Sequence, residues 1–143
     1  MKAFLSRYSY KIDRKGRVSV PAEYRSTLAE LGSDGILAFP SLTDRAIRCA
    51  TTALIEKITQ NTDPMALFEP GAPSRASLSL PDIVRLVPDP EGRVILPEHL
   101  IAHAGIADVA LFAGLGNHFE IWAPEAFDKH REALRAQLSG GRP

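Results

Sequence analysis

The chain opens with a segment in which apolar and polar residues alternate. Between residues 5 and 13, one face of an extended chain carries Tyr8, Tyr10 and Ile12, and the other carries Arg7, Ser9 and Lys11. A period of two is typical of a half-buried β-strand. The pattern predicts a strand with its aromatic side inward and its basic side outward, leading directly into a turn that contains glycine.

Other stretches show the spacing of amphipathic helices. One apolar stripe follows Pro21 and ends near Gly32 (Tyr24, Leu28, Leu31), and another follows Pro124 (Phe127, Leu134, Leu138), after which residues 139–143 form a loose tail. Proline suits the first turn of a helix because its missing N–H is not needed there. Shorter helices are predicted from Thr51 or Thr52 to Gln60 and from Pro97 to Gly105.

Short apolar runs between turn residues predict the remaining strands. They cover residues 36–39, 45–49, 83–87, 109–113 and 119–122, and the last of these alternates as Phe-Glu-Ile-Trp. Proline and glycine interrupt the sequence between residues 61 and 75, which is typical of a connecting segment. We therefore expect a first half at residues 1–60, a linker at 61–76 and a second half at 77–143.

One stretch occurs twice. Residues 13–24 and 89–100 share Asp, Gly, Arg, Val and Pro in register, at an offset of 76. Asp and Gly bracket a tight turn, where Gly supplies a positive φ and Asp bonds nearby backbone. A short strand follows and ends at a proline, which cannot donate to a sheet. Two such units suggest an internal pseudo-dimer. They predict a mainly β fold with short helices, in which interleaved hairpins bury residues 18–20 and 94–96 in one barrel-like core.

The formal net charge is zero, but the charges are unevenly distributed. Residues 1–25 hold seven basic and two acidic side chains, whereas the remaining residues hold ten basic and fifteen acidic ones. This asymmetry predicts a basic surface on an otherwise acidic body. A nucleic-acid partner is one explanation, and a solvated strand face without a partner is the other.

Other chemistry is poorly represented. A single cysteine, Cys49, excludes an intrachain disulfide and is expected to be buried and inert. His99 and His103 have helical spacing but lack a third metal ligand, and the Gly-Leu-Gly-Asn segment at 114–117 is expected to be a turn. We see no nucleophile–base pair and no cofactor loop, so we expect neither an enzyme nor a cofactor. No apolar run approaches the roughly 20 residues of a membrane span, and an intracellular location is expected.

Two D-x-x-G-R-V-x-x-P units and a terminal F-E-I-W strand together resemble the MraZ family of bacterial proteins, which are encoded with division and cell-wall genes. The resemblance is close at residues 13–31, 89–96 and 109–122. It implies an AbrB-like double-split β pseudo-barrel capped by helices. It also implies a cytoplasmic, nucleoid-associated transcriptional regulator that binds double-stranded DNA at repeated short boxes upstream of its own operon, and that assembles with itself into a ring.

The candidate DNA-binding residues follow from the two turns. Arginine offers a two-pronged hydrogen-bond donor to guanine, so Arg17 and Arg93 are candidates for base contact. The remaining candidates, chiefly for phosphate contact, are Arg14, Lys15, Arg7 and Lys11. Asp13, Gly16, Asp89 and Gly92 are expected to form the turns, and an ion pair between each arginine and its turn aspartate is the structural alternative.

The two turns differ at their tips. The second carries Pro90-Glu91 where the first carries Arg14-Lys15, so Glu91 would meet phosphate with the wrong charge. The neutral net charge and Glu91 support a competing hypothesis, an oligomeric ring that binds another protein without specific DNA binding.

Overall fold

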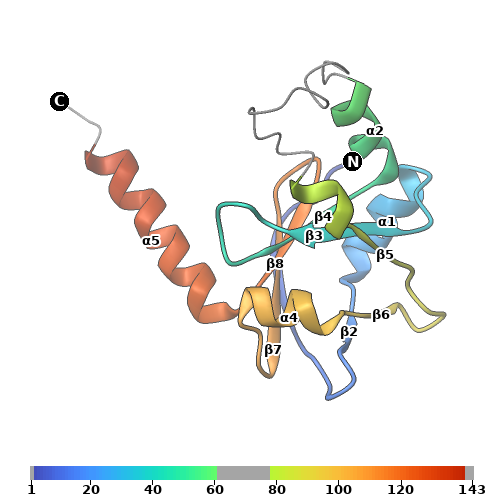
Figure 1. Ribbon diagram of the computed structural model, residues 1–143, viewed down its shortest axis with the longest axis horizontal. Coiled ribbons are helices and arrows are strands. Elements are labelled where there is room, and N and C mark those ends of the chain that lie inside the picture. The colour runs from blue at the N-terminus through green and yellow to red at the C-terminus, as the bar shows by residue number, and fades with distance from the viewer. Residues whose placement is uncertain (1, 61–77, 141–143) are drawn as a thin grey trace.

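The computed structural model describes residues 2–60 and 78–140, so the predicted linker at 61–76 lies outside the described residues (Figure 1). The described strands are β1 (Arg7–Lys11), β2 (Arg17–Ser19), β3 (Ile36–Pro40), β4 (Ile47–Ala50), β5 (Val84–Leu86), β6 (Arg93–Ile95), β7 (Val109–Gly114) and β8 (Phe119–Trp122). The described α-helices are α1 (Ala22–Glu30), α2 (Thr52–Gln60), α4 (Glu98–Ala104) and α5 (Pro124–Gly140), and a 3-10 turn, η2, covers Leu80–Asp82.

The strands form two antiparallel sheets. Six strands pair in the order β1-β7-β8-β4-β3-β5, and β2 pairs with β6 in a separate two-stranded ribbon. Both sheets combine strands from the two ends of the chain, because β1 pairs with β7 and β2 pairs with β6. The prediction of a mainly β fold with helices is confirmed, and the described strands do not close into a barrel.

The predicted alternation of the first strand is confirmed. In β1 the side chains of Tyr8 and Tyr10 are half-buried, whereas Arg7, Ser9 and Lys11 are exposed. Tyr8 and Tyr10 pack against one core cluster with Phe112 from β7. The basic side of β1 therefore faces outward, as the period of two indicates.

Tyr24 joins α1 to the large sheet. Its ring is fully buried and contacts Phe4, Tyr8 and Phe119 in edge-on or tilted geometry at centroid distances of 4.9 to 5.5 Å. Its hydroxyl donates to the carbonyl of Ser6 at 2.6 Å. Since Ser6 immediately precedes β1, this contact fixes the start of the strand that leads into the first turn.

The first predicted stripe is correct for Tyr24 and Leu28 but wrong for Leu31, which is exposed. The last residue of α1 is Glu30, and Leu31 is the C-cap of the helix. Gly32 then adopts φ +68° while Ser33 N–H bonds the Leu28 carbonyl at 2.9 Å. This Schellman arrangement turns the chain away before another helical turn could bury Leu31.

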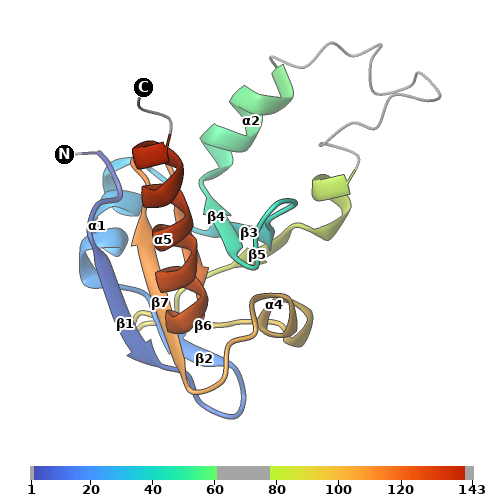
Figure 2. The same cartoon turned by 90° about the vertical axis from the view of Figure 1, so that its left-hand side faces the viewer.

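The stripe predicted after Pro124 is only partly correct. Phe127 packs against Trp122, but Leu134 and Leu138 are exposed, Leu138 at 76%. α5 starts beside β7 and then extends away from the rest of the chain (Figures 1 and 2). The helix also continues to Gly140, so the tail predicted from residue 139 begins later. None of the described helices is long and apolar enough to cross a bilayer.

Glu120 differs from the alternation expected for its strand, because all four residues of β8 are buried. One carboxylate oxygen accepts a hydrogen bond from Trp122 Nε1 at 3.1 Å, and the other lies 3.3 Å from Arg48 Nε. The second face of the sheet is covered here by Phe127 of α5 against Trp122. A charged residue is tolerated at this position because both of its oxygens have polar neighbours.

Candidate nucleic-acid interface

The two repeated turns adopt the same hydrogen-bonded structure. In the first, Asp13 N–H donates to the Arg17 carbonyl and Gly16 N–H to the Asp13 carbonyl, both at 3.0 Å. In the second, the equivalent bonds join Asp89 to Arg93 at 2.8 Å and Gly92 to Asp89 at 2.9 Å. Each bond in one turn recurs in the other at the offset of 76 found in the sequence.

The aspartate side chains close both turns. Asp13 Oδ1 accepts from the backbone N–H groups of Lys15 at 2.9 Å and Arg17 at 2.8 Å. Asp89 Oδ1 accepts from those of Glu91 and Arg93, both at 2.9 Å. These side-chain bonds satisfy the N–H groups at each turn tip.

Each turn is packed against the other half of the chain. Gly16 and Gly92 have φ of +83° and +81°. The Gly16 carbonyl accepts from Leu96 N–H at 2.8 Å, and the Gly92 carbonyl accepts from Val20 N–H at 2.9 Å. A side chain on either glycine would collide with its neighbours, because a Cβ on Gly16 would lie 2.6 Å from the Leu96 carbonyl oxygen and one on Gly92 would lie 2.6 Å from Arg25 Cζ.

The ribbon of β2 and β6 joins the bases of the two turns. Val18 pairs with Val94, and both are buried in the core. The neighbouring residues point to the opposite face, where Arg17 is paired with Ile95 and Ser19 with Arg93. Both candidate arginines therefore lie on the outward face of one small sheet.

In the described part of the chain, the Arg17 side chain is held in place through only one of its nitrogens. Its Nε donates to Asp13 Oδ2 at 2.7 Å, and its side chain is 39% exposed. Among the residues that the structure describes, its two terminal nitrogens have no hydrogen-bond partner. The ion pair weighed as the structural alternative is therefore present, and it leaves the outer edge of the guanidinium available to a ligand.

Arg93 is more fully occupied by carboxylates. Its Nε lies 3.4 Å from Asp89 Oδ2, and Nη2 lies 3.1 Å from Glu91 Oε2. Glu91 occupies the position that Lys15 has in the first turn. Its carboxylate competes with any anionic ligand for the outer edge of Arg93.

Comparison with known proteins finds relatives that align with most of the chain. A family model described as "MraZ protein, putative antitoxin-like" matches residues 84–140. The transcriptional regulator MraZ of Pelagibacter ubique is 41% identical over 136 residues, which cover 95% of this chain and 88% of the relative. That of Rickettsia peacockii is 40% identical over 135 residues, which cover 94% and 91%. The chain belongs to the MraZ family. The resemblance seen in its sequence is thereby confirmed, and these relatives are named as regulators and not as enzymes.

The turn aspartates of this MraZ family member are shifted toward their charged forms. Hydrogen bonds from the Arg17 backbone N–H and then from its side chain lower the pKa of Asp13 from its ordinary value of 3.8. The Arg93 backbone N–H, followed by that of Glu91, lowers the pKa of Asp89 from the same value. Both carboxylates are therefore ionised at neutral pH, as their role in orienting the two arginines requires.

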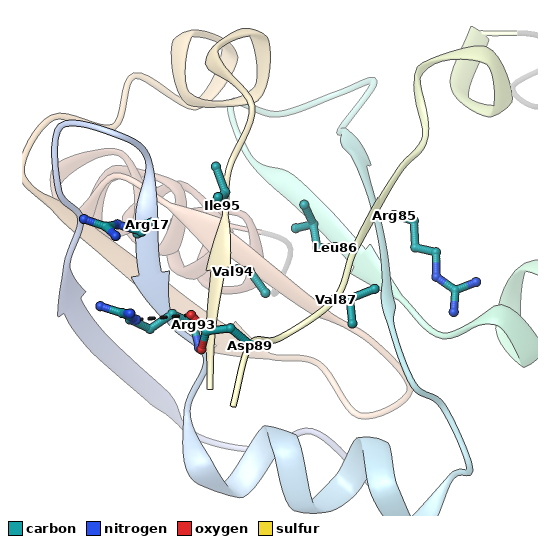
Figure 3. Close-up of a pocket in the computed structure, with 8 residues that line it drawn as sticks. All are labelled: Arg17, Arg85, Leu86, Val87, Asp89, Arg93, Val94 and Ile95. Atoms are coloured by element: carbon teal, nitrogen blue, oxygen red, sulfur yellow. Dashed lines mark hydrogen bonds and ion pairs between the residues drawn. The ribbon is translucent and has the colours of Figure 1, made fainter. Parts of the chain in front are cut away.

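A hollow of about 230 Å³ lies beside β6 (Figure 3). Its lining consists of Arg17, Arg85, Leu86, Val87, Asp89, Arg93, Val94 and Ile95. The guanidinium groups of Arg17 and Arg93 point away from Leu86 and Val87, and that of Arg85 bonds Asp34 at 2.6 Å (Figure 3). The exposed apolar side chains of this lining are Val87 and Ile95.

The prediction that residues 94–96 are buried together is wrong for Ile95. The side chain of Ile95 is 60% exposed, whereas Val94 and Leu96 are buried. A strand places alternate residues on opposite faces, so Ile95 shares the outward face with Arg93. That period could have identified it, but a run of three apolar residues conceals which face is buried.

The other candidates lie at different distances from the ribbon. Arg14 and Lys15 are exposed at the tip of the first turn, and Lys11 is exposed where β1 enters that turn. Arg7 lies at the opposite end of β1, where its Cζ is 5.9 Å from the ring centroid of Phe127 in α5. The structure thus brings Lys11, Arg14 and Lys15 together with Arg17, but it does not bring Arg7 to the same turn.

The histidines and the cysteine have local structural environments. His99 is exposed, and His103 Nε2 lies 3.0 Å from the backbone carbonyl oxygen of Asp44. Within residues 2–60 and 78–140, no group of three or more His, Cys, Asp or Glu side chains is placed to hold a metal ion. Cys49 is buried, and desolvation raises the pKa of its thiol.

Proposed function

We propose that this chain is a sequence-specific, DNA-binding transcriptional regulator. The observation that carries the proposal is Arg17, whose guanidinium is held by Asp13 and whose terminal nitrogens have no hydrogen-bond partner among the described residues. Arg14 and Lys15 are exposed in the same turn. Arginine in this state can donate two hydrogen bonds to the O6 and N7 atoms of guanine. The names of the MraZ relatives support the same regulatory function.

The turns and the ribbon support an internal two-fold repeat related to the AbrB-like double-split pseudo-barrel. In this proposal, residues 1–60 form the first repeat, residues 61–76 link the halves and residues 77–143 form the second repeat. The recurrence of the turn hydrogen bonds at an offset of 76 and the antiparallel pairing of β2 with β6 support the arrangement. The fold would thus present two related loops to DNA from a single chain.

Each candidate residue has a distinct role in this proposal. Arg17, and more weakly Arg93, contact bases, while the surrounding cations contact phosphates (Arg14, Lys15, Lys11, Arg7). Asp13, Gly16, Asp89 and Gly92 hold the turns in shape. Phosphate contacts supply affinity and position, whereas arginine–guanine contacts supply sequence selectivity.

The target and the assembly follow from the family resemblance. We infer repeated short boxes upstream of the chain's own division and cell-wall operon, bound by a homo-oligomeric ring in the cytoplasm at the nucleoid. Copies on a ring that engage adjacent boxes would gain affinity through their high effective concentration. The exposed Leu134 and Leu138 of α5 provide an apolar surface that is suited to subunit contact.

A fluorescence-anisotropy titration tests the function. Labelled DNA from upstream of the chain's own operon is titrated at two salt concentrations, with a scrambled duplex beside it. We expect selective binding that weakens steeply with salt, because bound cations release counterions from DNA. Arg17→Ala should reduce affinity by about tenfold or more. Lys57→Ala removes one charge on α2, far from the first turn (Figure 1), and should leave the affinity nearly unchanged.

The competing function is an oligomeric scaffold that binds another protein, and the exposed leucines of α5 are the observation that favours it. A scaffold would assemble normally but would not distinguish the two duplexes at either salt concentration. Light scattering on the same samples separates the two functions. Assembly without selective DNA binding would reject the regulator proposal and support the scaffold.

A further inference from the structure

The outward face of the β2–β6 ribbon carries one large apolar side chain beside its two arginines. Ile95 is 60% exposed, lies directly across from Arg17, and is two residues from Arg93 on the same strand (Figure 3). Leu96 N–H bonds the Gly16 carbonyl, so Arg17 and Ile95 form a non-hydrogen-bonded pair. Side chains in such pairs stand close together, with Cβ atoms roughly 5 Å apart.

The equivalent position in the other half is polar. At the offset of 76, Ile95 corresponds to Ser19, which is paired with Arg93. One arginine therefore has an isoleucine beside it, whereas the other has a serine. A difference at this site alters what can be recognised next to each arginine without altering the ribbon itself.

We propose that Ile95 is a specificity-determining residue that recognises the C5-methyl group of thymine at the base pair next to the guanine contacted by Arg17. This inference rests on the proposed function, since it requires Arg17 to lie against base edges. Apolar side chains in the major groove discriminate bases through the thymine methyl, and isoleucine has no polar atom that could contact phosphate.

The spacing and the surroundings of Ile95 fit this ligand. Adjacent base pairs are separated by about 3.4 Å along the duplex. Since the Cβ atoms of Ile95 and Arg17 stand roughly 5 Å apart, the two side chains start from positions about one base step apart. Val87, which is 58% exposed, lines the same hollow as Ile95. A methyl group placed there would contact aliphatic atoms, and the cations of the first turn would hold the DNA backbone nearby.

The serine at the equivalent position predicts an asymmetric target. The Ser19 hydroxyl both donates and accepts hydrogen bonds, so it tolerates several bases beside Arg93. The half of the site contacted by Arg17 and Ile95 should therefore require a methyl-bearing base, whereas the half contacted by Arg93 and Ser19 should not.

Replacement of single thymines by deoxyuracil tests the proposal, because it removes the methyl group and leaves base pairing intact. A duplex from the upstream region that wild type binds selectively is scanned one thymine at a time. We expect one thymine next to a guanine at which deoxyuracil weakens binding by about threefold to fivefold, the effect of one methyl-sized group. The Ile95→Ser variant should bind the thymine and deoxyuracil duplexes equally, and Ile95→Val should retain the preference for the thymine duplex. Leu115→Ser, which changes an exposed leucine outside the ribbon in the same way, is the control and should also retain it.

Several results would overturn this assignment. The assignment is wrong if wild type binds selectively but no deoxyuracil substitution weakens that binding. It is also wrong if Ile95→Ser still prefers thymine to deoxyuracil. A change in assembly mass for Ile95→Ser with an unaltered methyl response would assign the residue to a subunit contact instead. If Arg17→Ala loses selectivity but no deoxyuracil substitution weakens binding by wild type, the proposed function is supported and only the role of Ile95 is rejected. Absence of selective binding by wild type would reject both.

Discussion

The turn at residues 13–17 and the turn at residues 89–93 have the same backbone hydrogen bonds but different surfaces. The first carries one acid and three basic side chains, whereas the second carries two acids and one arginine. Asp and Gly, which are common to both, determine the hydrogen bonds and the positive φ. The two tip positions, 14 and 15 in the first turn and 90 and 91 in the second, are exposed and differ. The hydrogen bonds of the turn and its surface charge are therefore determined by separate residues.

The difference extends to the strands on either side. Lys11 and Tyr10 of the first half correspond to Val87 and Leu86 of the second. Tyr10 and Leu86 both pack in one core cluster, whereas Lys11 and Val87 are both exposed. The first half therefore presents a charge at this position, and the second presents an apolar side chain that lines the hollow beside β6.

The largest difference in stability is expected between alanine substitutions at the two turn glycines. Both positions have positive φ, but a Cβ at Gly16 would meet the rigid Leu96 carbonyl, whereas at Gly92 it would meet the movable Arg25 guanidinium. We expect Gly16→Ala to lower the free energy of unfolding by more than about 2 kcal/mol and Gly92→Ala by about 1–2 kcal/mol. Urea denaturation at one fixed protein concentration measures both.

Gly32→Ala provides the control, because Gly32 also has positive φ but has open space around it. Its loss of stability gives the cost of the backbone conformation alone. If Gly16→Ala were no more destabilising than Gly32→Ala, the close contact between the first turn and Leu96 would be unimportant.

DNA affinity should depend more on Arg17 than on Arg93. The terminal nitrogens of Arg17 are available, whereas Nη2 of Arg93 lies beside Glu91. We expect Arg17→Ala to cost about 1–3 kcal/mol of binding free energy and Arg93→Ala less than about 1 kcal/mol. Anisotropy titrations of both variants under one salt condition give the comparison. Arg17→Lys, which keeps the charge but loses the planar fork, should retain general affinity and lose selectivity. Equal losses in the two alanine variants would show that the turns contribute symmetrically.

The sequence predicted local structure better than it predicted exposure. The period of two in β1 and the proline after each short strand are local signals, and the elements they predicted are present. The aspartate and glycine that define each turn act over five residues, so their spacing carries the information. In these places the neighbouring residues alone determine the conformation of the chain.

The exposure of particular side chains depended on distant contacts. Ile95 is exposed because its side chain lies on the face of the ribbon opposite buried Val94, and Glu120 is buried because α5 covers part of the sheet. Leu138 is exposed because α5 leaves the body of the chain. The contact between Glu91 and Arg93 also depends on side-chain rotamers that composition does not specify. Sequence periodicity assigns such residues to one face of an element, but it does not indicate which face the rest of the chain covers.

Reversing the charge at the tip of each turn should change the salt dependence of DNA affinity in opposite directions. Glu91→Lys frees Arg93 and adds a cation, whereas Lys15→Glu removes one from the first turn. Because each phosphate contact changes the slope of log K against log salt by about 0.9, Glu91→Lys should steepen it by about 1 and Lys15→Glu should flatten it by about 1. The affinity changes should be only a few-fold at moderate salt. A slope that remains constant in Lys15→Glu would remove Lys15 from the interface.

The smallest difference should appear in acid titration of the two turn aspartates. Both have a pKa below the ordinary value of 3.8, so each stabilises the fold fully above that value and loses its contribution as pH falls through the lower, folded pKa. The side-chain bond from Arg17 to Asp13 is 2.7 Å, whereas the Arg93 contact to Asp89 is 3.4 Å. We therefore expect Asp13 to titrate at a lower pH than Asp89, as carboxyl-carbon NMR shifts would show. Asp13→Asn should be less stable than wild type at pH 7 and should approach it in acid. The reverse order of titration would mean that the Arg17 side chain does not hold Asp13, and the geometry on which the base contact depends would be lost with it.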